Sequence, residues 1–285
     1  MKRRKSTKIL VLEILTFILL IIFFLPFILV ILNAAKSYVS PNAVLILPET
    51  WGQIFLNIEE ILNDDSVRYV ESFFNSLLIT STSLMAIGVL SGMAAWVLVR
   101  RKTKYSFFIF MFFLSGLVIP FQVVMIPLVQ QLTKLRALTG IPFKDTLWGV
   151  VLAYIGFGAP LSVFLFHGFI KSVPIDIEEA AIIDGCSKPQ VFFKVVLPIL
   201  KPIFVTLLVL NGMWIWNDFL LPSLVIGTGG NLQTIPMGIM SLAGSYVVPW
   251  HLLLTAVLLA ALPAVVLFIF AQKYIIQGMT SGAIK

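Results

Sequence analysis

Charged residues and cysteine are the scarce features of this 285-residue chain. Charged residues make up 12% of it and hydrophobic residues 59%, whereas a soluble domain is roughly a quarter charged. The mean hydropathy of +1.03 means that a water-soluble globule could not bury the apolar surface. This composition excludes a soluble enzyme, a nucleic-acid-binding domain and a disordered chain, and it predicts an integral membrane protein.

Residues that build metal or catalytic centres are equally sparse. Cys186 is the only cysteine, which excludes an intramolecular disulfide and a site made of several thiolates. His167 and His251 are far apart and lack the spacing of metal ligands. The chain has no G-x-x-x-x-G-K-[ST] phosphate loop. We therefore expect no catalytic residue, no metal site, no cofactor bound by the chain itself, and no membrane enzyme.

Long apolar runs are what the sequence has in abundance. A spanning helix needs about 20 mostly apolar residues, and six stretches meet that requirement. The first is too long for the apolar region of a cleavable signal peptide, so we expect it to be retained. The predicted fold is all-α, with a cytoplasmic N-terminus over 1–13, a six-span domain over 14–273 and a cytoplasmic tail over 274–285. The expected spans are about 14–32, 73–99, 106–130, 147–170, 202–221 and 251–272.

The basic residues are distributed unevenly between the two sides of this six-span arrangement. Fifteen of the twenty Lys and Arg residues lie on the side that carries both termini. Basic loops stay in the cytoplasm, so both termini are predicted to be cytoplasmic. The same bias accounts for the net charge of +7, and membrane lipid rather than nucleic acid is the expected partner.

The loop over 171–201, between the fourth and fifth spans, carries the most distinctive pattern. Asp176 followed by Glu179 resembles a capping box, and Gly185 supplies a left-handed residue that ends a helix. These residues predict a two-turn helix over about 177–184, and Ser187-Lys188-Pro189 begins a second helix. A two-turn helix is unstable alone, so it must pack either on a partner protein or on the membrane surface.

The outer segment over 222–250 differs from the rest in having no Asp, Glu, Lys or Arg. Thr234 is expected to cap a helix that begins at Ile235, and Gly244 to end that helix. A neutral hairpin that dips toward the membrane fits this pattern.

Several of these motifs together resemble a known family. Glu179-Ala180-Ala181-Ile182-Ile183-Asp184-Gly185, followed by Leu197-Pro198, is similar to the E-A-A-x-x-D-G loop of bacterial ATP-binding-cassette (ABC) importer permeases. The tail from Gln272 to Lys285, Asn75-Ser76 and Trp216-Asn217-Asp218-Phe219 resemble the carbohydrate-type, maltose-type branch. Cys186 stands where the family more often has alanine.

The resemblance implies a six-transmembrane-helix permease bundle with a short cytoplasmic coupling helix, in a prokaryotic plasma membrane. It implies a second permease subunit, two ABC subunits that hold ATP and Mg, and an extracytoplasmic binding protein that delivers a sugar or oligosaccharide. A polyol or glycerol-phosphate substrate is the alternative. The residues implied to contact the ATPase are Glu178, Glu179, Ala180, Ala181, Asp184 and Gly185 in the loop, and Gln277, Gly278, Gly282 and Lys285 in the tail.

Polar and aromatic side chains in the predicted spans are the candidates for a substrate path. Polar groups are costly within a bilayer, and sugars bind amides, carboxylates and aromatic faces. The candidates are Gln122, Asn211, Trp214, Trp216, Asn217 and Asp218. Asn217 and Asp218 fall near the outer rim, where an interfacial or bend-capping role stays open.

A self-contained secondary transporter is a further alternative from the sequence. Such a protein would need an internal repeat and ionisable residues at mid-membrane. The sequence has no convincing repeat and almost no charge within its spans, which favours the subunit of a larger transporter.

Overall fold

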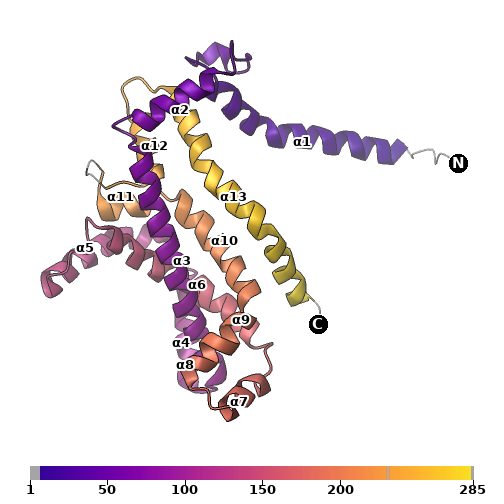
Figure 1. Ribbon diagram of the computed structural model, residues 1–285, viewed down its shortest axis with the longest axis vertical. Coiled ribbons are helices and arrows are strands. Elements are labelled where there is room, and N and C mark those ends of the chain that lie inside the picture. Colours follow the sequence, from indigo (N-terminus) through magenta and orange to yellow (C-terminus); the bar gives the residue numbers. More distant parts are fainter. Residues whose placement is uncertain (1–6, 229, 231, 284–285) are drawn as a thin grey trace. The chain divides into compact units, whose positions relative to one another are not determined.

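The computed structural model describes residues 7–228, 230 and 232–283, and every regular element among them is helical (Figure 1). Within these described residues, four helices are long and apolar enough to cross a membrane, and six spans result if each of two sharply bent helix pairs counts as one. The predicted all-α integral-membrane fold is confirmed. The elements are α1 (Thr7–Ala34), η1 (Pro41–Ala43), α2 (Gln53–Asn63), α3 (Tyr69–Arg100), α4 (Lys104–Gly116), α5 (Phe121–Thr139), α6 (Leu147–Ile170), α7 (Asp176–Ile183), α8 (Lys188–Val191), the π-helical turn η2 (Phe192–Val196), α9 (Leu197–Ile199), α10 (Lys201–Asn217), α11 (Leu220–Ile226), α12 (Ile235–Ala243) and α13 (Trp250–Ala283).

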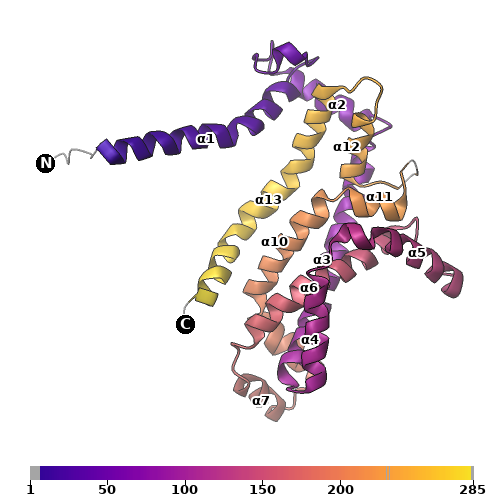
Figure 2. The same ribbon diagram turned by 180° about the vertical axis from the view of Figure 1, so that it is seen from behind.

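The chain divides into two compact units. Unit 1 comprises 1–69 and 238–262, and unit 2 comprises 70–237 and 263–285. Helix α6 is central to unit 2, because α4, α10 and α11 all pack against it (Figure 2). One apolar cluster surrounds Tyr154 on α6, and a second surrounds Phe166 on the same helix.

Glycine permits close packing of α3 within unit 2. A Cβ atom added at Gly88 would lie 2.5 Å from the ring of Phe204, and one at Gly92 would lie 3.4 Å from the ring of Phe192. Small residues at such spacing let membrane helices approach one another. The Gly88-x-x-x-Gly92 pattern therefore marks the contact of α3 with η2 and α10.

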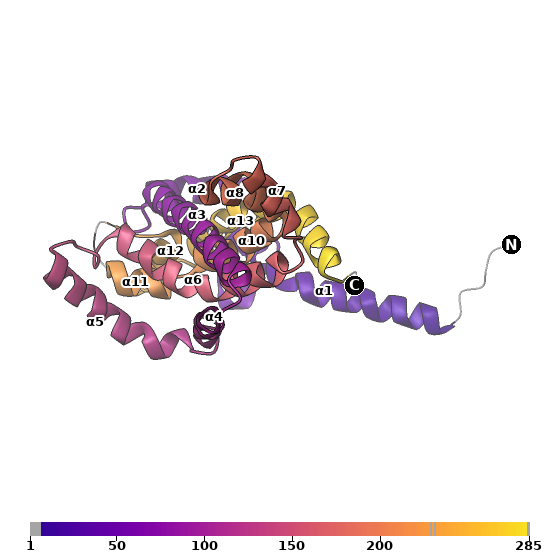
Figure 3. The same ribbon diagram turned by 90° about the horizontal axis from the view of Figure 1, so that it is seen from below.

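The stretch expected as the third span is bent by 105° between α4 and α5 (Figure 3). Pro120 precedes α5 and has no N–H to bond to the carbonyl of Gly116, and it disfavours helical backbone at Ile119. A second bend of 77° separates the α8–η2–α9 segment from α10. Apolar composition alone predicts one continuous span across each bend, because it carries no information about the direction of the backbone.

In unit 1, buried polar bonds fix the chain that leaves α1. The Lys36 ammonium donates to Asn33 Oδ1 at 2.8 Å and to the carbonyl of Ala43 at 2.6 Å. Asn57 on α2 donates to the carbonyls of Ala34 and Lys36, each at 2.8 Å. Because α1 ends at Ala34 with unpaired carbonyls, these side chains satisfy the helix end and hold the outer loop.

Candidate functional site

Helix α7 (Asp176–Ile183) is the two-turn helix expected in the loop over 171–201. It ends as predicted: Gly185 has φ +87°, its N–H donates to the carbonyl of Ile182, and the N–H of Cys186 donates to the carbonyl of Ala181, both at 3.0 Å. The predicted capping box at the start is wrong. Ile175 occupies the N-cap position, with no side-chain cap, and the acidic residues of the first turn instead favour the positive end of the helix dipole.

The second helix begins where the sequence predicted. The N–H of Ser187 donates to Oε1 of Gln190 at 2.8 Å, which closes the start of α8. The π-helical turn η2 follows directly, and Phe192 and Val196 from it are buried against α3 and α6. Helix α7 packs against α8 and η2, and this segment therefore connects α7 to the core of unit 2.

Glu178 lies on the inner face of α7 and is 5% exposed. Its carboxylate accepts hydrogen bonds from Trp96 Nε1 at 2.8 Å and from Arg100 Nε at 2.9 Å and Nη2 at 2.6 Å. Arg100 Nη2 also donates to the carbonyl of Val173 at 3.0 Å. We call Trp96, Arg100 and Glu178 the Glu178 anchor, because they join α7 and the preceding loop to the end of α3.

The opposite face of α7 is exposed. Ile182 is 53% and Ile183 85% exposed, and Glu179, Ala180 and Asp184 are also exposed. The candidate ATPase-contacting residues therefore fall into two groups: Glu178 points inward and Ala181 is half-buried, whereas the others face outward. An apolar patch rimmed by carboxylates is typical of a protein interface.

The tail candidates lie at the end of the described chain. Gln277, Gly278 and Gly282 fall within the backbone of α13 (Trp250–Ala283). Lys285 lies outside the described residues. The tail role stays a prediction.

The path candidates in unit 2 also divide by exposure. Asn211 is buried and donates to Ser162 Oγ at 3.2 Å, and buried Trp216 contacts the Phe73 ring edge-on at 5.9 Å. Asp218 accepts from the Tyr154 hydroxyl at 3.1 Å and from the N–H of Leu220 at 2.9 Å, so it caps the start of α11. The exposed candidates are Gln122, Trp214 and Asn217.

Sequence reasoning missed three residues that organise these ends. Arg100 was counted only among the basic residues that orient the spans, and its partner Glu178 is 78 positions away. Trp96 and Tyr154 resemble ordinary aromatic residues of a span until the fold brings a carboxylate to each. The signal that the sequence offers for the anchor is weak: Arg100 is the first residue of the basic run Arg100-Arg101-Lys102 that follows an apolar span.

The described residues contain no group of three or more His, Cys, Asp and Glu side chains able to hold a metal ion. The site consists of an exposed helix surface and an ion pair whose carboxylate is buried. Such an arrangement can bind a protein and transmit its displacement.

The solved structures contain the same fold. A chain in the crystal structure of a bacterial ABC transporter involved in the import of the acidic polysaccharide alginate matches with a TM-score of 0.74, over 96% of this chain and 99% of that chain, at 17% identity. This likeness defines the fold class, a multi-pass helical membrane protein.

Sequence comparison identifies the family. Residues 85–281 match the model of the binding-protein-dependent transport system inner membrane component, and the chain belongs to that family. A probable starch degradation products transport system permease of Thermoanaerobacterium thermosulfurigenes is 42% identical, over 75% of this chain and 76% of that protein. The melibiose/raffinose/stachyose import permease of Bacillus subtilis is 32% identical over 92% and 91%, and the multiple sugar-binding transport system permease of Streptococcus mutans is 32% identical over 80% of each.

Proposed function

We propose that this chain is a permease subunit of an ATP-driven importer of sugars or oligosaccharides. It forms the membrane path with a second permease, receives its substrate from an extracytoplasmic binding protein, and has no enzymatic activity of its own. Two separate ABC subunits hold ATP and Mg. The observation that carries the proposal is α7, which is anchored on its inner face by Glu178 and presents an exposed face with Ile182 and Ile183.

The distribution of charge supports a cytoplasmic position for α7. Basic residues gather at the end of unit 2 where α3 ends, α4 begins, α6 ends and α10 begins. The positive-inside rule assigns that end to the cytoplasm, together with both termini. These residues are Arg100, Arg101, Lys102, Lys104, Lys171, Lys188, Lys194 and Lys201.

The proposed mechanism transmits a displacement through α7. The exposed face seats in a cleft of an ATPase subunit, with the isoleucines as apolar contacts and Glu179 and Asp184 as polar ones. When the ATPase pair closes on ATP, α7 moves. The Glu178 anchor joins this helix to α3 by three hydrogen bonds to one carboxylate, so the span moves with α7 and the path opens to the other side.

The substrate proposal rests on the relatives, whose names specify starch degradation products and melibiose, raffinose and stachyose. Of the path candidates, we propose Gln122, Trp214 and Asn217 as sugar contacts, because their side chains are exposed. Asn211, Trp216 and Asp218 are bonded or packed within the chain, and we propose that they position the path.

Substitution at the exposed face of α7 tests the ATPase contact. Ile182→Asp places a charge in the proposed interface, and we expect the ATPase subunits to be lost from the purified complex and uptake to fall at least tenfold. Ile141→Asp is the matched control, because Ile141 is 54% exposed and lies between α5 and α6. Retention of the ATPase by the Ile182→Asp complex would contradict the proposal.

The substrate class is tested on the complex with its binding protein in nanodiscs. We expect starch-derived oligosaccharides to raise ATP hydrolysis and to compete for uptake, and polyols and glycerol phosphate esters to do neither. Stimulation by the polyols alone would overturn the sugar assignment while leaving the permease assignment intact.

A further inference from the structure

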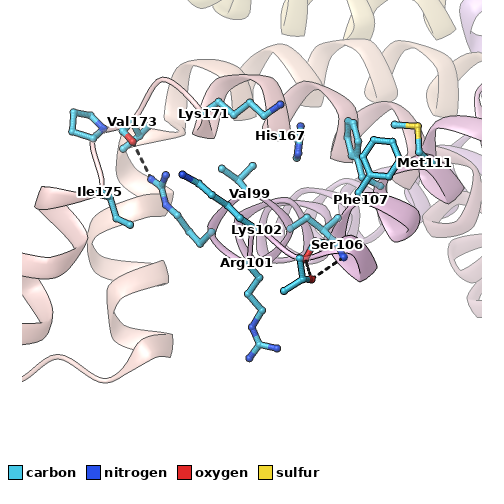
Figure 4. A pocket seen from close by; sticks show the side chains of 15 residues that line it. Val99, Arg101, Lys102, Ser106, Phe107, Met111, His167, Lys171, Val173 and Ile175 are labelled. Atoms are coloured by element: carbon cyan, nitrogen blue, oxygen red, sulfur yellow. Dashed lines mark hydrogen bonds between the residues drawn. The ribbon is translucent and has the colours of Figure 1, made fainter.

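A cavity of about 750 Å³ opens in unit 2 beside the Glu178 anchor (Figure 4). Its walls come from the end of α3, the turn into α4, the first turns of α4, and the end of α6 with the loop that follows. The loop side includes Lys171 and Val173, and Val173 is the residue whose carbonyl binds Arg100. The cavity therefore borders the segment that leads into α7.

The charge lining this cavity is all of one sign. Arg100, Arg101, Lys102 and Lys171 line it, and no Asp or Glu does. Glu178, which does not line the cavity, neutralises Arg100 through their ion pair. Within the described part of the chain, no hydrogen bond or ion pair is made by the side chains of Arg101, Lys102 or Lys171. In Figure 4, Lys102 reaches toward the loop that holds Val173 and Ile175, and Arg101 extends away from it.

The α4 side of the same cavity is apolar. Phe107, Phe110 and Met111 line it, and Phe107 is 59% exposed. Phe110 stacks on the imidazole of His167, with 3.7 Å between the ring centroids, which joins the wall of α4 to α6. The cavity thus combines unpaired cations at a helix end with an exposed apolar wall along a membrane helix.

We propose that this cavity binds the headgroup of an anionic phospholipid. Lys102 and Lys171 contact the phosphate, and the acyl chains lie along the exposed face of α4. Basic pockets between membrane helices are suited to anionic headgroups, and each Lys or Arg near the surface adds to that attraction. A free phosphate ion would satisfy the cations and leave the wall of α4 without a ligand, so the geometry favours the lipid.

The bound lipid would stabilise the loop from Lys171 to Val173 and thereby the position of α7. This consequence rests on the proposed function, since it requires α7 to couple to an ATPase. The binding itself does not, because it depends only on the cavity. We expect an anionic lipid to increase the ATP hydrolysis that is coupled to transport.

Native mass spectrometry of the purified complex tests the binding. Phosphatidylglycerol is titrated in parallel with phosphatidylcholine and with inorganic phosphate. We expect selective retention of phosphatidylglycerol, and roughly thirtyfold weaker binding in the Lys102→Gln/Lys171→Gln variant from the loss of two surface cations. Lys188→Gln/Lys194→Gln is the matched control, because it removes the same charge from exposed positions that do not line the cavity.

Three results would overturn the proposal: equal weakening in the control, which means a diffuse basic surface; equal retention of phosphatidylcholine; and displacement of the lipid by inorganic phosphate. ATP hydrolysis in nanodiscs with and without phosphatidylglycerol then measures the effect on coupling. Selective binding without stimulation would overturn only the coupling step. Retention of the ATPase by the Ile182→Asp complex would overturn the proposed function and leave the lipid binding untouched, so the two failures are distinguishable.

Discussion

The two ends of unit 2 each hold a carboxylate that joins separate elements, and the two carboxylates are stabilised differently. Glu178, at the end that carries α7, accepts from an indole N–H and twice from a guanidinium. Asp218, at the far end of α10, accepts from a phenol and from backbone N–H groups. One joint is an ion pair whose carboxylate is buried and whose guanidinium is partly buried, and the other is a set of hydrogen bonds from neutral donors.

The two joints differ in the free energy needed to break them. Removing one partner of an ion pair leaves a buried charge without compensation, whereas removing one neutral donor leaves the carboxylate with fewer hydrogen bonds, at a smaller cost. The α7 end is therefore the more costly joint to break, as the proposed transmission of displacement through α7 requires. The α10–α11 end can separate at lower cost, which suits the proposed opening of the path.

The largest expected effect comes from breaking the ion pair. In Arg100→Gln, Glu178 loses the guanidinium, and we expect the docking of α7 to weaken by about 3–5 kcal/mol. Cys186 is the sole thiol of the chain, and it is half-buried against the cluster around Phe166. Its maleimide labelling in the membrane should accelerate at least tenfold, and coupled uptake should fall.

The Arg100→Gln/Glu178→Gln double variant sharpens this measurement. It removes both charges, so labelling of Cys186 should return toward the wild-type rate even though the ion pair is absent. Lys194→Gln removes a nearby exposed charge and serves as the control. A double variant that labels faster than Arg100→Gln would show that burial of an unpaired charge is not the cause.

Tyr154→Phe tests the other end and should have a smaller effect. The substitution removes a hydrogen bond from a fully buried hydroxyl to the Asp218 carboxylate, at a cost of about 2 kcal/mol. We expect a lower thermal unfolding temperature of the solubilised complex, with unchanged labelling of Cys186. Faster labelling would contradict the separation of the two ends into independent joints.

Local chemistry made the end of α7 predictable, and long-range pairing did not. Gly185 ends the helix because a residue with positive φ is needed there, and that requirement is visible in the sequence. The Glu178 anchor was invisible, since Arg100 and Glu178 belong to different elements, and only the packing of α3 beside η2 brings them together. The spacing of Asp176 to Glu179 predicts a cap, but the backbone of Ile175 already has helical angles, so Ile175 occupies the N-cap position instead.

The same distinction holds elsewhere in the fold. Helix α12 begins at Ile235 and ends before Gly244, as predicted. The expected cap from Thr234 is wrong, because Ser76 Oγ on α3 accepts from the N–H of Ile235 at 2.9 Å instead. The six apolar stretches were readable from composition, whereas the bend at Pro120 depends on whether neighbouring helices support a kinked span or a broken one.

The substitution with the smallest expected effect tests whether the turn that ends α7 holds the helix in position as strongly as the Glu178 anchor does. In Gly185→Ala, a residue with a side chain must adopt a backbone φ of +87°, although no atom lies within 4 Å of the added Cβ. We expect a loss of about 1 kcal/mol from backbone strain alone, and labelling of Cys186 about fivefold faster. Gly168→Ala on α6 is the matched control, because its Cβ also meets nothing within 4 Å and its φ is not positive. If Gly185→Ala accelerated labelling as much as Arg100→Gln, the position of α7 would depend on its turn as much as on the Glu178 anchor, and the contrast between the two ends of unit 2 would no longer rest on the ion pair.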